Sequence, residues 1–153
     1  LGGGGLTSRL MEEVRRERGL TYGIGAGLRL ASYADMLVGG VATQNARAAE
    51  TVSVLRDEWA RIAENGVTDE ELTRAKTYLT GAYPLRFDGN GRIANILVNM
   101  QVDDMPIDYV NTRNAKVAAV TLEQVNRVAA DLIRPEDLHM VVVGRPEGLG
   151  AGN

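Results

Sequence analysis

Residues 1–30 read LGGGGLTSRLMEEVRRERGLTYGIGAGLRL, a glycine run followed by a helical pattern and then by an alternating one. The glycine run at residues 2–5 predicts a flexible loop. Leu10 and Val14 lie four positions apart and form the apolar stripe of the helix that follows. Gly19 is a typical residue just beyond a helix end. The stretch therefore predicts a loop, a helix and then a change of secondary structure.

From Leu20 onward the apolar residues recur at every second position, which is typical of a strand. Ile24 and Ala26 share one face, whereas the opposite face carries mainly glycine. A nearly bare face predicts a close approach by another backbone or helix. After a turn at residues 32–35, residues 36–43 predict a second strand, antiparallel to the first.

The remainder of the chain predicts several helices and one further strand. Two capping boxes, Thr68 with Glu71 and Thr121 with Gln124, each open a helix. Asn45 can cap a long helix that Gly66 ends. The predicted helices lie at about residues 45–65, 68–84, 93–100, 107–117 and 121–134. The continuous apolar run at residues 138–143 is typical of a central strand.

These elements predict an α+β fold, with a mixed and largely antiparallel sheet covered by helices. The length of 153 residues suits one domain, which we place at residues 1–144, followed by a flexible tail at 145–153. Three predicted strands make a thin sheet for so many helices. We therefore expect that at least one strand and one helix of the domain precede Leu1.

The composition excludes several classes of function. A net charge of −3 gives no electrostatic footprint for nucleic acid, and no apolar stretch is long enough to span a membrane. The chain has no cysteine, which excludes disulfides, thiolate metal sites and a cysteine nucleophile within it. Its one histidine, His139, cannot by itself form a zinc site with two or three histidines.

Most candidate motifs have an ordinary structural explanation. A glycine run before a helix can bind phosphate, but this run lacks the Gly-Lys-Ser/Thr ending of a P-loop, so a hinge is favoured. His139 is more typical of a structural strand residue than of a metal ligand. The helix carboxylates, such as Glu12 paired with Arg16, are interpreted as solvated surface charges.

Arg15 and Tyr22 form the most informative pair. They lie seven residues apart, one on the last turn of the first predicted helix and one at the start of the first strand, with a glycine reversal between them. This spacing can bring both side chains to one end of the sheet. Guanidinium and phenol donors that converge on a carbonyl oxygen would bind and polarise it, as an oxyanion hole does. Alternatively, the two are ordinary helix-surface and strand residues.

The opening motif resembles a known family. The segments LGGGGLTSRL at residues 1–10, EVR at 13–15 and RGLTY at 18–22 closely resemble the second, C-terminal domain of the pitrilysin/insulinase-type zinc metallopeptidases. This family includes the mitochondrial processing peptidases. The resemblance continues to about residue 144 and is most specific in the opening motif.

The resemblance implies an assembly with two related domains. A zinc site built on His-x-x-Glu-His lies in the first, N-terminal domain, and a partner half closes over it around unfolded peptide substrates. The second domain supplies an Arg and a Tyr seven residues apart, which match Arg15 and Tyr22. The glycine-rich loop implicated in substrate handling matches Gly2, Gly3, Gly4 and Gly5.

This chain contains no His-x-x-Glu-His. We therefore expect no metal site in it and no peptide hydrolysis by it alone; zinc would belong to the assembled parent enzyme. The expected function is that of the C-terminal domain of a bacterial zinc endopeptidase, with periplasm and cytoplasm both open. Two alternatives remain: a non-catalytic structural subunit of the same fold, and a module that binds peptides along the hairpin at residues 20–43.

Overall fold

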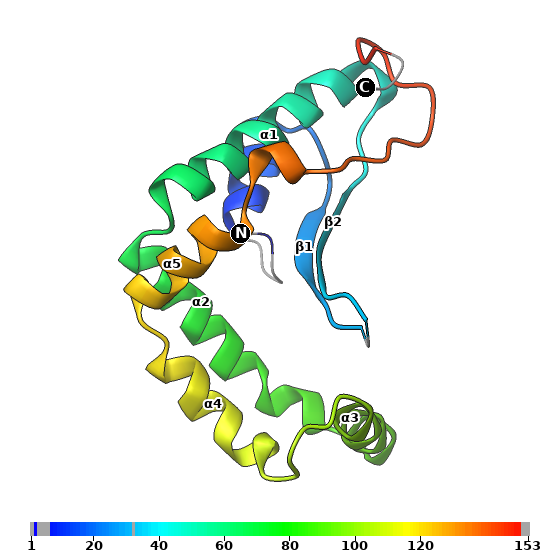
Figure 1. The fold of residues 1–153 in the computed structure, drawn as a ribbon. Helices are drawn as coiled ribbons and strands as arrows, with labels where there is room; N and C mark the ends of the chain where they lie inside the picture. Colours follow the sequence, from blue (N-terminus) through cyan, green and yellow to red (C-terminus); the bar gives the residue numbers. More distant parts are fainter. Residues whose placement is uncertain (1, 3–6, 32, 151–153) are drawn as a thin grey trace. The chain divides into compact units, whose positions relative to one another are not determined.

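The computed structural model describes residues 2, 7–31 and 33–150 of the chain. The fold is α+β, as predicted: helices accompany a two-stranded antiparallel sheet. The chain divides into two compact units. The first unit joins Leu1–Gly66 to Val128–Asn153, and the second comprises Val67–Arg127. Figure 1 labels the helices and strands of both.

The first unit begins with η1 (Met11–Glu17), a π-helix with Met11 and Val14 buried. Gly19 ends it with a φ of +58°, a left-handed conformation that glycine adopts at little cost. The Gly19 N–H donates to the carbonyl of Arg15 at 3.0 Å. The predicted helix and its glycine terminator are therefore confirmed.

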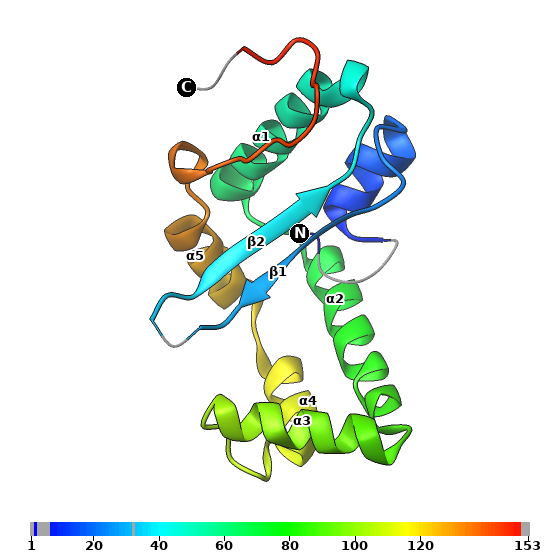
Figure 2. The same ribbon diagram turned by 90° about the vertical axis from the view of Figure 1, so that its right-hand side faces the viewer.

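A hairpin follows, made of β1 (Ile24–Arg29) and β2 (Met36–Val41) (Figure 2). The strands are antiparallel, as predicted, and their register pairs Ile24 with Val41 and Ala26 with Gly39. β1 starts later than Leu20 because the Leu20 N–H donates to the carbonyl of Val14 instead of joining a ladder. Residues 20–23 therefore belong to the connection that precedes the strand.

The long helix α1 (Ala48–Asn65) packs against this first part of the chain. Its Val54 joins Leu10, Val14 and Leu20 in a buried cluster, which Ile24 and Ala26 partly cover. Gly66 ends the helix with a φ of +67°, as predicted. The expectation that Asn45 caps it was wrong. A 3₁₀ turn, η2 (Asn45–Arg47), leads into α1, and its N-cap residue Gln44 makes no capping hydrogen bond.

A second buried cluster in this unit joins α1 to the end of α5 (Leu122–Leu132). Ile62 packs there against Ala129 and Ile133, with Trp59 at the margin. The chain then turns through η4 (Pro135–Asp137), so Pro135 follows the end of α5 as expected. This packing holds the C-terminal part of the chain against α1.

The prediction of a strand at residues 138–143 was wrong. The segment belongs to no strand, and Val141 and Val143 are 91% and 93% exposed. A strand needs a neighbouring backbone to satisfy its N–H and C=O groups. Residues 139–143 make no backbone hydrogen bond within the described part of the chain. An apolar run therefore becomes a strand only where such a partner is present.

The second unit is helical, and its last segment is the first part of α5. Thr68 caps the first helix in a capping box with Glu71, and Thr121 and Gln124 hydrogen-bond in the same pattern. Both capping boxes are therefore confirmed. The further elements are α2 (Asp69–Ala82), η3 (Pro84–Phe87), α3 (Asn90–Val102) and α4 (Tyr109–Ala119).

Polar contacts to backbone carbonyls join α2 and α4. Arg113 and Asn114 on α4 donate to the carbonyls of Leu79 and Thr80 at 3.0 Å each. The Arg113 guanidinium also lies 4.3 Å from the ring centre of the buried Tyr83. Where the second unit begins and ends along the chain, the Asn126 side chain accepts a hydrogen bond from the Val67 N–H at 2.8 Å. None of the described helices is long and apolar enough to cross a membrane.

Candidate functional site

Tyr22 lies in the connection between η1 and β1, and its side chain is 95% exposed. The two residues before it, Leu20 and Thr21, are buried. Leu20 enters the core with Val14 and Val54. The burial of the preceding residues leaves the phenol of Tyr22 directed into solvent.

The Thr21 hydroxyl fixes the backbone beside Tyr22. It donates to the carbonyl of Ala42 at 2.6 Å and accepts from the N–H of Gly23 at 3.1 Å. The first contact ties the connection to the end of β2, and the second closes a turn around Tyr22. A buried hydroxyl that is satisfied on both sides holds its segment firmly.

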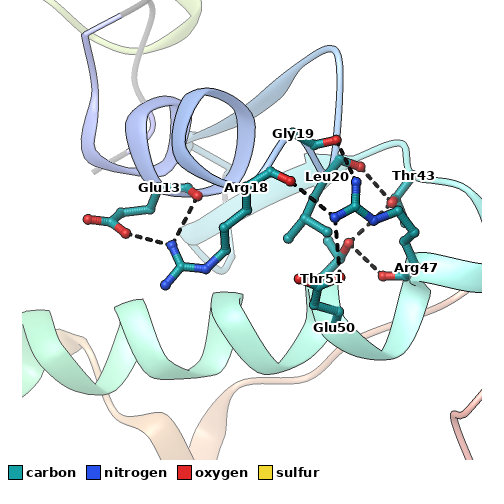
Figure 3. A network of polar contacts seen from close by, with 8 residues as sticks. All are labelled: Glu13, Arg18, Gly19, Leu20, Thr43, Arg47, Glu50 and Thr51. Carbon is teal, nitrogen blue, oxygen red and sulfur yellow. Dashed lines mark hydrogen bonds and ion pairs between the residues drawn. The ribbon is translucent and has the colours of Figure 1, made fainter.

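Arg47, at the start of α1, clamps the other end of the connection (Figure 3). Its guanidinium donates to the carbonyls of Gly19 at 3.0 Å and Arg18 at 3.1 Å. The Thr43 hydroxyl donates to the carbonyl of Leu20 at 2.7 Å and accepts from the buried Thr51 at 3.1 Å. We call residues 18–23 the anchored loop, because tertiary contacts hold it along most of its length.

Arg15 lies in the last turn of η1 and is half-buried. Its guanidinium makes no hydrogen bond or ion pair with any residue that the structure describes. By contrast, Arg16 pairs with Glu12 at 2.6 Å, and Arg18 pairs with Glu13 at 2.8 Å. Arg15 and Tyr22 thus flank the Gly19 turn with uncommitted donors, and their convergence on one point stays a prediction.

The predicted glycine loop lies partly within the described residues. Gly2 is buried, and its carbonyl accepts from the N–H of Ala26 at 3.1 Å. A Cβ atom at Gly2 would lie 2.7 Å from the Ala26 nitrogen, so the close approach to β1 requires glycine. Gly3, Gly4 and Gly5 lie outside the described residues. Substrate handling by the run stays a prediction.

Glu58 on α1 is a buried carboxyl that the sequence pattern did not indicate as a site residue. It is 1% exposed and lies 3.0 Å from Arg61. Burial raises the pKa of Glu58, Arg61 opposes that shift, and Glu13 adds to it. Its Oε2 atom has no hydrogen-bond partner among the described residues. The available signal was its position one turn after Val54 on the apolar face of α1.

The side chains in the described ranges do not fit a zinc ion. Zinc sites in proteins use Cys, His and carboxylate ligands, and His139, on the extended segment after η4, is exposed. No group of three or more His, Asp and Glu in the described ranges could hold a metal ion.

Comparisons with known proteins agree with the expected family. The sequence model of the peptidase M16 inactive domain matches residues 1–79. A Streptomyces coelicolor protein named an uncharacterized zinc protease is 33% identical over 141 residues, covering 86% of this chain and 28% of that protein. A non-peptidase homolog from Helicobacter pylori is 26% identical, covering 92% of this chain and 33% of that protein.

Solved structures support the same assignment. The crystal structure of a peptidase M16 inactive domain from Pseudomonas fluorescens matches with a TM-score of 0.77 and 30% identity, over 88% of this chain and 32% of that chain. A Helicobacter pylori protease shares the fold, with a TM-score of 0.68 and 15% identity over 86% and 31% of the two chains. The chain thus spans about a third or less of the relatives described. Because the family model covers more than half of its residues, this chain belongs to the family of peptidase M16 inactive domains.

Proposed function

We propose that this domain serves a larger zinc-dependent endopeptidase, in which Tyr22 and Arg15 bind substrate and stabilise the transition state. The zinc site itself would be carried by another domain or subunit. The observation that carries the proposal is the exposed phenol of Tyr22 on an anchored loop. Membership of the M16 inactive-domain family supports the peptidase context.

The chemistry assigned to Tyr22 is donation of one hydrogen bond. When a peptide carbonyl is attacked, its oxygen gains negative charge, and a donor already in place stabilises that charge without reorganising. The hydrogen bonds of Thr21 and Thr43 fix the backbone around Tyr22, so the point from which the phenol projects is set before substrate arrives. The phenol therefore acts mainly on the transition state.

The role assigned to Arg15 is to hold a substrate carbonyl or to orient Tyr22. A guanidinium offers several donors in a fixed fork, and that of Arg15 is not engaged by any described side chain. The glycine run at residues 2–5 would handle the unfolded peptide near this site. An N-terminal zinc-binding domain, a second subunit, or both would close over it as partners.

The test is steady-state kinetics of the complete assembled enzyme on a quenched peptide. Tyr22→Phe should lower kcat with little change in KM, by at most about a hundred- to a thousandfold, the cost of losing one oxyanion donor. Arg15→Ala should raise KM if it holds a substrate carbonyl. Tyr33→Phe is the matched control, because Tyr33 is fully exposed in the hairpin turn. An unchanged kcat for folded Tyr22→Phe would refute the catalytic role.

A second candidate function is that of a non-catalytic structural or peptide-binding subunit. The name of the Helicobacter pylori relative, a non-peptidase homolog, favours it. The two functions differ in one measurement. A complete, zinc-loaded protein that binds an unfolded peptide without cleaving it supports the second, whereas turnover that depends on Tyr22 supports the first.

A further inference from the structure

The chain contains two Asn-Gly pairs, Asn65–Gly66 and Asn90–Gly91. In such a pair the backbone nitrogen of the glycine can attack the side-chain carbonyl carbon of the asparagine, because the glycine has no β-carbon to hinder the approach. The attack needs a glycine nitrogen whose N–H is not held by an acceptor, and an asparagine side chain that can turn toward it. The two pairs differ in both respects.

Asn65 and Gly66, at the end of α1, are held by hydrogen bonds. The Gly66 N–H donates to the carbonyl of Ile62 at 2.9 Å. The side-chain amide of Asn65 donates to the carbonyl of Arg61 at 3.2 Å. Attack of the Gly66 nitrogen on the Asn65 side chain therefore requires both hydrogen bonds to break first.

Asn90 and Gly91, at the start of α3, have no such contacts, and both residues are exposed. The Gly91 N–H lies in the first turn of α3, where the helix itself supplies no acceptor. It makes no hydrogen bond to any residue that the structure describes. The side chain of Asn90 likewise has no hydrogen-bond partner in the described ranges.

The backbone around Asn90 also has room to move. Gly89, the residue before it, has an extended backbone, so the helix does not continue on that side. A Cβ atom added at Gly89 or Gly91 would meet nothing within 4 Å. Because helix ends fray, the attack requires only the first turn of α3 to open, the turn in which the Ile93 N–H donates to the Gly89 carbonyl at 3.0 Å.

We propose that Asn90 is a site of non-enzymatic deamidation, with water as the co-reactant. The Gly91 nitrogen loses its proton to solvent and forms a bond to Cγ of Asn90. The bond from Cγ to Nδ2 breaks, and Nδ2 takes up a proton and leaves as ammonia. Water then adds to either carbonyl carbon of the succinimide ring and breaks its bond to the ring nitrogen, which regains a proton. The exchange of ammonia for water leaves a carboxylate at residue 90, in aspartyl or isoaspartyl linkage.

The two products should have different effects on α3. The aspartyl form keeps the backbone and places a negative charge at the first residue of the helix, where the helix dipole favours it. The isoaspartyl form routes the main chain through the side-chain carbons, which inserts an additional carbon atom into the turn closed by Ile93 and Gly89. That hydrogen bond is then lost. The inference does not rest on any role of Tyr22 or Arg15.

Peptide mapping of the complete natural protein tests the proposal. The protein is incubated at neutral pH and physiological temperature, and samples are digested with trypsin. Cleavage at arginine releases residues 87–92 and residues 62–74, each with a single asparagine. Mass spectrometry should show the amide-to-acid conversion at Asn90 at least about tenfold faster than at Asn65, whose hydrogen bonds must open first. Samples digested at time zero give the conversion that digestion itself causes.

Equal rates at the two asparagines, or no conversion at Asn90 above the time-zero level, would overturn the proposal. Isomerisation of the neighbouring Asp88–Gly89 pair does not interfere, because it leaves the mass unchanged. The same incubation in denaturant should bring the two rates together. An undiminished difference in the denatured protein would show that the folded structure does not select Asn90, and would also overturn the proposal.

Two glycine variants test the mechanism. Gly91→Ala adds a β-carbon beside the attacking nitrogen and should slow conversion at Asn90 at least about tenfold. Gly89→Ala is the matched control, because it leaves that nitrogen unchanged and should slow conversion much less. Both positions have open space for the added atom, so both variants should fold. An unaltered rate in Gly91→Ala would contradict attack by the Gly91 nitrogen.

Amide hydrogen exchange tests the effect on α3. In the separated isoaspartyl form, the amide of Ile93 should exchange at least about fivefold faster than in the unmodified protein. In Asn90→Asp, which reproduces the aspartyl form, it should exchange no faster than in the unmodified protein. Equal exchange of the Ile93 amide in the isoaspartyl form and in Asn90→Asp would refute the different effects assigned to the two products.

Discussion

Replacement of Arg47 by methionine should loosen the anchored loop while leaving the rest of the fold in place. Arg47→Met keeps much of the apolar stem and removes the donors to the carbonyls of Arg18 and Gly19. A hydrogen bond that involves a charged group contributes roughly 1.5–3 kcal/mol when water is excluded. The Arg47 side chain is partly exposed, so water replaces part of each bond, and we expect a total loss of about 1–2 kcal/mol.

This loss should appear as local opening. A change of one or two kcal/mol alters an opening equilibrium by roughly 5- to 30-fold. The reporters are the amides of Leu20, which bonds to Val14, and of Gly23, which bonds to the Thr21 hydroxyl. Hydrogen exchange followed by NMR should show both accelerated by that factor in Arg47→Met.

Arg56→Met is the matched control, because Arg56 is exposed on the same helix. It should leave the exchange of Leu20 and Gly23 unchanged. Thr43→Val, which removes the hydroxyl contact to the Leu20 carbonyl at nearly constant volume, should accelerate the same two amides. Wild-type exchange in both Arg47→Met and Thr43→Val would show that these contacts do not anchor the loop.

Three further predictions concern stability. Gly2→Ala places a Cβ atom 2.7 Å from a β1 nitrogen and should lower the free energy of unfolding by about 1–3 kcal/mol. The control Gly27→Ala has open space around the new Cβ atom and should not lower the free energy of unfolding in this way. Because burial raises the pKa of Glu58 from its ordinary value of 4.5, the folded state binds more protons than the unfolded state between the two pKa values. Stability should therefore fall as the pH rises through that window, and denaturation at several pH values should show a weaker fall for Glu58→Gln than for the exposed control Glu64→Gln. Thr68→Ala removes a capping bond and should cost about 0.5–2 kcal/mol, measured by circular dichroism during denaturation.

Features set by local backbone chemistry could be predicted from the sequence. Gly19 and Gly66 both end helices with positive φ, and Thr68 makes its capping box with Glu71. In each case the deciding contacts lie within a few residues along the chain. Such signals are fixed before tertiary structure forms, which is why they were reliable.

Features that need a distant partner could not be predicted in the same way. The run at residues 138–143 has the composition of a central strand, yet it remains an extended segment because no described backbone pairs with it. Glu58 illustrates the converse, since a carboxyl in a helix is normally solvated. It is buried because it lies where η1 packs against α1, with the Arg61 guanidinium beside it. Both outcomes depend on packing rather than on local pattern.

The candidate site combines both kinds of information. The spacing and the family resemblance indicate Tyr22 and Arg15, but the contacts that hold the anchored loop, which carries Tyr22, come from Thr43 and Arg47, more than twenty positions along the chain. An exposed loop normally keeps its conformational freedom, and ordering it costs entropy. Here several hydrogen bonds offset that cost around a side chain that is itself 95% exposed. The fold gains no burial from Tyr22 in return. An exposed aromatic ring with a polar tip, carried on an anchored backbone, is, however, the arrangement that favours recognition of another molecule.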